Sequence, residues 1–311
     1  MRDGPAEFRH LPVMAAEALS LLKPRPGQTA VDATLGGGGH AERLVAALSP
    51  GGRLIGLDVD EEALQWCRQR LVPLAAQARV AFEAVHANFA TLGEVLDTLG
   101  VERIHALLAD LGVSFHQLSR EERGFSFLAD APLDMRMDLS ATTTAADLVN
   151  RLSERELADL IFRYGQEHKS RRIARAVVAE RRRGPITTTA QLARVVARAV
   201  LGRKGGRLRI HPATRTFQAL RIAVNDELGN LKRLLDQLPE RLESGGRFAI
   251  ISFHSLEDGL VKEFLRQHTQ RSETRPPTLR ALTPKPLRPS EAEVAANPRA
   301  RSARLRAAER L

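Results

Sequence analysis

The chain of 311 residues has a single cysteine, Cys67, and few aromatic residues. One cysteine excludes a disulfide framework and argues against a zinc site with cysteine ligands, and no metal is expected. Aromatic residues make up 4% of the chain, so a platform of many stacked rings is not expected. No apolar run is long enough to span a membrane, and the first 20 residues lack the pattern of a secretory signal. These absences indicate a cytoplasmic globular protein.

Positive charge is concentrated in two segments of the chain. The formal net charge is +10, and residues 141–213 carry 16 Lys and Arg against 6 Asp and Glu. Residues 271–311 carry 10 against 4, whereas the remainder carries 21 against 27. Clustered cations bind polyanions because they release condensed counterions, so this pattern favours a nucleic-acid partner. Solvated helix faces and a loose tail are the alternative interpretation.

Strands and helices alternate over the first part of the chain. Helices with one apolar face separate short apolar runs, which predict strands at 29–34, 53–58, 80–86 and 104–110. Such alternation requires crossover connections, and these join parallel strands. The predicted fold class is therefore α/β, and residues 1–117 form the first part of this domain.

The alternation stops between residues 118 and 213, where we predict helices and no strand. Ser153 with Glu156 is a capping-box signal, and Thr188 or Thr189 caps a later helix. Because this segment is also the most basic, we interpret it as an all-helical insertion that recognises the substrate.

The α/β pattern resumes after the insertion, so residues 214–311 form the second part of the domain. An apolar run predicts a strand at 247–253. From residue 271 the chain is rich in Pro, Arg and Ala with weak periodicity. We expect this basic tail to be extended or partly disordered.

Four consecutive glycines, residues 36–39, follow the first predicted strand. Gly36, Gly38 and Ala41 satisfy the dinucleotide fingerprint G-x-G-x-x-[GA], and bare backbone allows close approach of a ligand. Asp58 ends the second strand, where an acid binds the ribose of a nucleotide cofactor. These features suit both NAD and S-adenosylmethionine, and the lack of a following G-K-[ST] excludes a P-loop.

Acids at the strand ends distinguish between the two cofactors. Asp32 lies in the first strand beside the glycines, and Asp110 ends the fourth. Since ligands bind at the carboxyl edge of a parallel sheet, we expect both acids and Asp58 to surround one ligand. Acids repel a pyrophosphate but suit the ammonium group and ribose of S-adenosylmethionine. A tight turn at the glycines, with Asp58 and Asp110 as caps, is the alternative.

Several long blocks of the chain resemble one family, the bacterial ribosomal RNA small subunit methyltransferase H family, also called MraW. They span nearly the whole chain and occupy residues 10–14, 32–40, 110–114, 123–127, 132–138, 211–221, 252–258 and 297–302. The resemblance implies a class I, Rossmann-like methyltransferase sheet with an inserted helical domain. It also implies S-adenosylmethionine as methyl donor.

The implied reaction is methylation of N4 of one cytidine in the decoding region, at the P site, of 16S rRNA. The implied partner is 16S rRNA within the small ribosomal subunit or a late precursor, and the protein would be a monomer or homodimer. Another nucleic-acid substrate, a non-catalytic RNA-binding assembly factor and an NAD enzyme remain alternatives.

Cofactor residues carry over from the family by position, and Asp32 joins them by the reasoning above. The residues implied by the resemblance are Gly38, Gly39, His40, Asp58, Phe89, Asp110 and Gln117. This chain departs from the family at Phe115 and His116, where the family usually has Ser and Pro.

Three residues are candidates to assist the chemistry. Cytosine N4 is a poor nucleophile, and groups that accept its N–H hydrogens sharpen its lone pair. Asp110 is the first candidate, with the carbonyls of Leu111 and Gly112 beside it, although the proline pair of many amino-methyltransferases is absent there. Asp134, in a charged loop, and His254, after the last apolar strand, are the others. The alternative for Asp134 is an acid that caps a helix or lies at the surface, and the alternative for His254 is an ordinary histidine at the edge of the sheet.

Arginines of the insertion and of the neighbouring blocks are candidates to bind the RNA. Such contacts go to phosphates and position the RNA without reading its sequence. The candidates are Arg136, Arg171, Arg172, Arg215 and Arg221. Among the few rings, Phe125, Phe127 and Tyr164 are candidates to pack an unstacked base, with a core position as the alternative for each.

Overall fold

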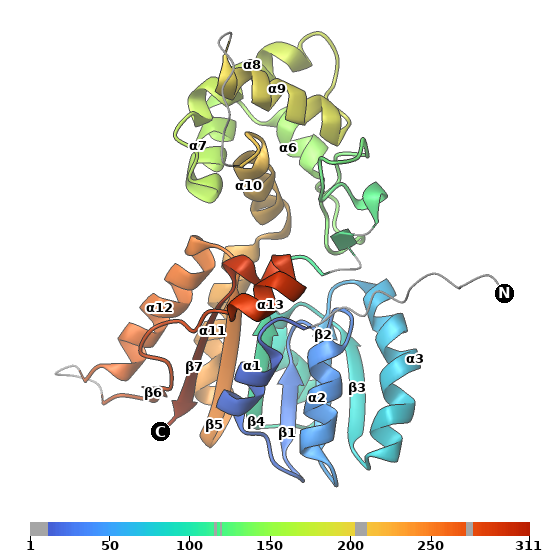
Figure 1. The fold of residues 1–311 in the computed structure, drawn as a ribbon, viewed down its shortest axis with the longest axis vertical. Coiled ribbons are helices and arrows are strands. Elements are labelled where there is room, and N and C mark those ends of the chain that lie inside the picture. Colours follow the sequence, from blue (N-terminus) through green and yellow to red (C-terminus); the bar gives the residue numbers. More distant parts are fainter. Residues whose placement is uncertain (1–11, 115–116, 119, 203–209, 272–275) are drawn as a thin grey trace. The chain divides into compact units, whose positions relative to one another are not determined.

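The computed structural model describes residues 12–114, 117–118, 120–202, 210–271 and 276–311, drawn as ribbon in Figure 1. The chain forms two compact units, unit 1 (residues 1–115 and 230–311) and unit 2 (residues 116–229). The sequence places the return to the α/β domain at residue 214. The structure places it at 230, because helix α10 (Thr214–Asn225) packs on helix α7 (Glu154–Gly165) of unit 2.

Unit 1 contains one sheet of seven strands in the order β3-β2-β1-β4-β5-β7-β6. All neighbouring strands are parallel except β7, which runs antiparallel to β5 and β6. The strands are β1 (Thr29–Asp32), β2 (Arg53–Asp58), β3 (Ala81–His86), β4 (Ile104–Asp110), β5 (Leu242–Ser252), β6 (Leu279–Ala281) and β7 (Arg304–Arg310). The first four confirm the predicted strands, and β5 begins five residues before the predicted position of 247.

Alternate residues of each strand face two separate apolar cores. In β4, Ala106 and Leu108 face one core, while Leu107 and Ala109 face the other. Helices α1 (Ala15–Leu22), α2 (Gly39–Leu48) and α3 (Glu61–Gln77) cover the first face, as Figure 1 shows. Helices α4 (Leu92–Thr98), α11 (Glu227–Arg241) and α12 (Ser255–Thr269) cover the second. Burial on both faces explains why the strands read as continuous apolar runs.

The prediction of a loose tail is wrong for residues 276–311. This segment forms β6, helix α13 (Glu291–Ala296), the turn η3 (Pro298–Ser302) and β7, with β7 inserted between β5 and β6. Leu305 is fully buried, and Arg306 pairs with Asp258 at 2.7 Å. Two of the five buried positions of β7 are the charged residues Arg306 and Glu309, and two more are alanines, so its apolar pattern is weak.

Unit 2 is a bundle of helices with its own apolar core. Its helices are α6 (Ala145–Arg151), α7, α8 (Ser170–Arg181), α9 (Thr189–Leu201) and α10, preceded by the turn η2 (Glu121–Arg123). The predicted capping box of Ser153 with Glu156 is confirmed, and Thr188 caps α9. Among the helices of the described residues, none is long and apolar enough to cross a membrane.

Candidate active site

The glycine loop joins β1 to α2, and its glycines have different roles. Gly36 and Gly38 have positive φ angles of 48° and 75°, which side chains other than glycine rarely adopt. A Cβ on Gly38 would lie 3.0 Å from the Cys67 sulfur, and a Cβ on Gly39 would lie 3.2 Å from Pro12. A Cβ on Gly37 would meet nothing within 4 Å. The run therefore serves the turn and its packing, and leaves open space at Gly37.

Asp58, at the end of β2, holds this loop in place. Its Oδ2 accepts the N–H of Gly36 at 2.7 Å, and its Oδ1 accepts the N–H of Asp60 at 2.9 Å. Asp60 is the residue that caps α3, by accepting the N–H of Glu62. Burial raises the pKa of Asp58 to about 6, although these N–H bonds oppose the shift. Each of its oxygens keeps a second lone pair, which a ribose hydroxyl can use.

Asp32, His40 and Asp110 form the buried centre of the candidate site. Asp32 is 1% exposed at the end of β1, and its Oδ1 accepts the N–H of Thr34 at 3.2 Å. His40 is 8% exposed in the first turn of α2, and its Nε2 lies 3.4 Å from Asp110 Oδ2. Asp110 ends β4, where its own N–H donates to the Thr34 hydroxyl at 2.6 Å. Three elements therefore meet at the carboxyl edge of the sheet.

The charges of this centre depend on one another. Burial raises the pKa of Asp32 to about 6, and the nearby His40 opposes this shift. Burial alone would lower the pKa of His40, but the Asp110 carboxylate and the charge of Asp32 outweigh it and raise that pKa. An imidazolium at His40 thus stabilises the ionised form of Asp32.

Three atoms of this centre are buried without a hydrogen-bond partner among the described residues. They are Asp32 Oδ2, His40 Nε2 and Asp110 Oδ1. Leaving such a group unsatisfied costs about 1–3 kcal/mol, and unsatisfied groups in native structures often mark a ligand site. The two carboxylate oxygens suit a ligand with an ammonium group and N–H donors.

Phe89 lies near the same edge of the sheet, three residues after the end of β3. It begins the turn η1 (Phe89–Thr91), which Asn88 caps by accepting the N–H of Ala90 at 2.9 Å. Its ring is partly buried against the second apolar core. This position allows Phe89 to offer an apolar surface to an adenine ring.

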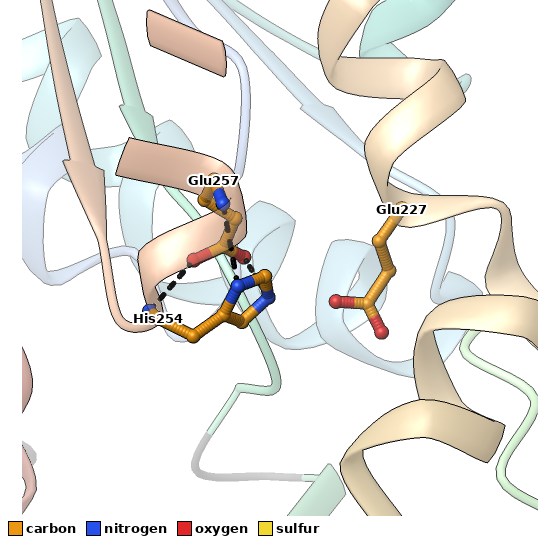
Figure 2. Close-up of side chains that lie close together, drawn as sticks. All are labelled: Glu227, His254 and Glu257. Carbon is orange, nitrogen blue, oxygen red and sulfur yellow. Dashed lines mark hydrogen bonds and ion pairs between the residues drawn. The ribbon is translucent and has the colours of Figure 1, made fainter. Parts of the chain in front are cut away.

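His254 and Glu257 form a capping box at the start of α12, shown in Figure 2. His254 Nδ1 accepts the N–H of Glu257 at 3.3 Å, and Glu257 Oε2 accepts the N–H of Phe253 at 2.8 Å. The His254 Nε2 lies 3.2 Å from Glu257 Oε1. Glu227, also drawn in Figure 2, belongs to unit 2 and accepts two N–H bonds of 2.8 Å from Arg221. The cap uses Nδ1 of His254, while its Nε2 is buried without a hydrogen-bond partner among the described residues, so a catalytic role for His254 stays a prediction.

Asp134 and Arg136 are bonded to each other in unit 2. Arg136 donates from Nε and from a terminal nitrogen to the two Asp134 oxygens, at 2.8 and 2.7 Å. Burial alone would raise the pKa of Asp134, but the hydrogen bonds from Arg136 outweigh burial and hold that pKa below its ordinary value. Arg136 also donates to the carbonyls of Leu139 and Ala141. Asp134 is therefore a poor candidate for a proton acceptor, and the pair instead shapes its loop.

The other arginine candidates of unit 2 fall into two groups. Arg215 donates to the Gln166 carbonyl at 3.2 Å, and Arg221 is paired with Glu227 as described above. Arg171 and Arg172 are exposed at the start of α8, and neither has a carboxylate within 4.0 Å in the described part of the chain. Gln117 is buried in unit 2, and Phe115 and His116 lie outside the described residues.

The sheet order, the antiparallel β7 and the acids that end β1, β2 and β4 define a class I methyltransferase. Residues 7–311 match the MraW methylase family, and the chain belongs to this family.

Curated relatives agree with this assignment over their full length. The chain is 52% identical to the Ribosomal RNA small subunit methyltransferase H of Geobacter sulfurreducens, covering 98% of the chain and 99% of the relative. It is 48% identical to the protein of the same name from Syntrophus aciditrophicus, with full coverage of both. Among solved structures, an rRNA methylase from Streptococcus thermophilus matches 100% of this chain and 99% of that one, with a TM-score of 0.43 and 14% identity.

The cofactor of this methyltransferase is S-adenosylmethionine. The unsatisfied carboxylate atoms of Asp32 and Asp110 fit its ammonium group, and Asp58 fits its ribose. The roles of these residues toward the cofactor stay predictions. Sequence reasoning missed the pairing of His40 with Asp110, because the two residues are far apart in the chain.

Proposed function

We propose that the chain transfers a methyl group to N4 of one cytidine in the decoding region of 16S rRNA. The names of its relatives, which refer to small-subunit ribosomal RNA, support this substrate. The observation that carries the proposal is the group of three unsatisfied buried atoms on Asp32, His40 and Asp110 beside the glycine loop. Such a group is costly in a protein that binds only RNA through its surface.

The residues around the glycine loop would hold the cofactor. Asp32 would bind the ammonium group, Asp58 the ribose hydroxyls, and Phe89 the adenine. The first turn of α2, with Gly39 and His40, presents N–H groups that have no acceptor within the helix. These groups suit the cofactor carboxylate. The remaining space at Gly37 would admit the methionine chain.

Asp110 is the group that we assign to the proton of the reaction. S-adenosylmethionine supplies an electrophilic methyl group on a sulfonium. As N4 bonds to the methyl carbon, the carbon–sulfur bond breaks and its electron pair goes to sulfur, and N4 must then lose one proton. Asp110 accepts that proton through its unsatisfied Oδ1. His40 Nε2 lies 3.4 Å from the other oxygen and would hold the carboxylate in place.

Unit 2 would bind the RNA, within a small subunit or a late precursor, and the enzyme would act in the cytoplasm. Arg171 and Arg172 are the arginines with the clearest access to phosphates. Arg136 and Arg221 are bonded to acids of their own unit, so they would contribute their remaining donors. Arg215 donates one N–H to the Gln166 carbonyl, so it too would bind phosphate through its remaining donors.

Methyl transfer from labelled S-adenosylmethionine, assayed side by side on 16S rRNA, small subunits and DNA, tests the substrate. The proposal predicts label in RNA and none in DNA, with 16S rRNA and small subunits compared as forms of the substrate. Label in DNA alone would overturn it. Binding of cofactor and RNA without methyl transfer would instead indicate a non-catalytic assembly factor. Preferential binding of NAD in calorimetry would exclude both the methyltransferase and the assembly factor.

A further inference from the structure

Two blocks far apart in the sequence meet ring against ring in unit 2. The rings of Phe127 and His211 are stacked, with centroids 4.5 Å apart and an interplanar angle of 25°. Phe217 meets Phe127 edge-on, with centroids 4.9 Å apart. Phe217 is buried in the core of unit 2, Phe127 is partly buried against that core, and His211 is exposed. The stack therefore runs from the core to the surface and ends in the imidazole.

The imidazole of His211 is held in a fixed orientation. Its Nδ1 accepts the N–H of Ala213 at 3.2 Å. An accepting Nδ1 places the proton of a neutral ring on Nε2. One ring face is stacked on Phe127, and one nitrogen is fixed by the backbone. A solvent-exposed side chain with two such restraints is prepared to bind through its other face.

Large apolar side chains next to this stack are also exposed. Leu128, which follows Phe127, is 92% exposed, and Ile210, which precedes His211, is 50% exposed. Burial of either side chain against a ligand would be favourable. Both exposed apolar side chains are sequence neighbours of the stacked rings, so exposed apolar surface is found in the same two blocks as the oriented imidazole.

We propose that the outer face of His211 is a stacking platform for one unpaired nucleobase of the RNA substrate. This inference rests on the proposed function and adds a contact to it. A base fits because its flat surface matches the ring, and because unit 2 also exposes Arg171 and Arg172 without carboxylate partners in the described residues. A single RNA strand carries both a flat base for the ring and phosphates for the arginines. Phe127, expected to pack a base itself, instead supports the ring that does so.

Binding of a fluorescein-labelled single-stranded oligocytidine RNA, followed by fluorescence anisotropy, tests the proposal. Base–aromatic stacking contributes about 1–3 kcal/mol per base. His211→Ala should therefore weaken RNA binding by roughly 5- to 100-fold, since 1.4 kcal/mol is about tenfold. His211→Phe, which keeps a ring, should restore most of the affinity.

A matched control is available in the same unit. His168 is also exposed and also meets a phenylalanine, but its ring lies 6.5 Å from that of Phe162 at an angle of 62°. His168→Ala should leave the affinity unchanged. Calorimetric affinity for S-adenosylmethionine, which would bind unit 1, should be the same in all variants, and an unchanged helical circular dichroism spectrum and melting temperature would show that unit 2 is folded.

A second measurement uses the unaltered protein. Replacing bases of the RNA by abasic sites should weaken binding to the wild type, and should have a smaller effect on His211→Ala. Equal RNA affinity of the wild type and His211→Ala would overturn the platform while leaving the proposed function intact. Failure of the wild type to bind the oligonucleotide would also overturn the platform, whereas the proposed function is decided separately by methyl transfer to 16S rRNA and small subunits.

Discussion

Asp32, His40 and Asp110 form a charge arrangement that only a ligand completes. The two acids lie beside one histidine, whose Nε2 is 3.4 Å from Asp110, and each acid has a buried oxygen without a hydrogen-bond partner among the described residues. A cationic group bound there would stabilise the ionised acids, and a bound N–H donor would satisfy the remaining oxygen. The same arrangement thus serves both cofactor binding and proton transfer in the proposed mechanism.

Asp110→Asn should lower turnover by about 10²–10⁴-fold, because a general base contributes about that factor. The amide keeps the shape of the side chain but cannot accept the proton. Single-turnover methyl transfer measures the loss, and an unchanged melting temperature would show that the fold is intact.

The control for this variant is Asp97→Asn, an exposed acid of unit 1 that pairs with Arg241 at 2.6 Å. It should retain wild-type turnover. Full activity of Asp110→Asn would contradict the assignment of Asp110.

Cofactor affinity should depend on pH around 6. Burial raises the pKa of Asp32 and of Asp58 to about 6, so both are largely protonated below that pH. An ammonium group requires ionised Asp32, so the Kd for S-adenosylmethionine should rise about tenfold per pH unit lost below 6 for each acid that must ionise. Above about pH 7 it should be constant. Calorimetry from about pH 5 to 8 measures this.

The effect of these acids on folding has the opposite sign. The folded chain holds their protons more tightly than the unfolded chain, so their contribution to stability falls as pH rises from 3.8 to about 6. Asp32→Asn should bind the cofactor weakly at every pH, with a flatter profile. A wild-type Kd that is constant between pH 5 and 7 would refute the pH argument.

The acids of the site could be predicted from the sequence, but their partners could not. Asp32, Asp58 and Asp110 lie at the ends of strands that apolar patterns reveal, and parallel strands end at one edge. The choice of Asp60 over Asp58 as the cap of α3 depends on packing between distant elements. The same is true of the position of His40 beside Asp110. Such packing leaves no local signal.

At the scale of elements, β7 links the tail of the chain to the sheet. Its neighbours are β5 on one side and β6 on the other, and Arg304 and Arg306 both pair with Asp258 of α12. The tail is therefore part of the fold of unit 1, and its arginines are not all available for RNA. Arg304 and Arg306 therefore do not belong to a loose basic tail.

Leu305→Ala should destabilise unit 1 by about 2–5 kcal/mol, because Leu305 is fully buried in β7. Chemical denaturation followed by circular dichroism measures the shift in midpoint. Leu311→Ala, at a leucine that is 53% exposed, is the matched control and should change stability by less than about 1 kcal/mol. Equal effects of the two variants would show that β7 is not buried as described.

Elements with strong local signals were predictable, and elements that depend on tertiary pairing were not. The capping boxes of α7 and α9 combine a cap residue with an apolar face, so sequence patterns reveal them. Helix α3 continues past Pro73 to Gln77, because Leu71 and Ala75 lie buried on one face on either side of the proline. Strand β7 has only one large apolar residue, Leu305, among its buried positions, and its pairing with β5 and β6 is what reveals it.

At the scale of the whole molecule, acidic and basic groups are separated between the two units. Unit 1 carries buried acids around the glycine loop, whereas unit 2 carries exposed arginines on α8. In the proposed function, unit 1 holds the cofactor and unit 2 holds a polyanion. Composition predicted this division, because charge was already uneven along the sequence.

RNA binding should weaken steeply with salt, and Arg171→Ala with Arg172→Ala should reduce that dependence. Each phosphate contact that is lost lowers the slope of log K against log salt by about one. Filter binding or anisotropy at several salt concentrations measures it. Arg155→Ala is the control, because Arg155 is highly exposed but lies 3.9 Å from Asp159. A flat response of the wild type would contradict an RNA-binding role for unit 2.

The most direct test of the central claim is to map a transferred methyl group. Small ribosomal subunits that lack the modification would be incubated with the protein and methyl-labelled S-adenosylmethionine, and their 16S rRNA digested for mass spectrometry. We predict N4-methylated cytidine at one position in the decoding region, with little product from Asp110→Asn. Label on another base, on a ring carbon or at many positions would contradict the account.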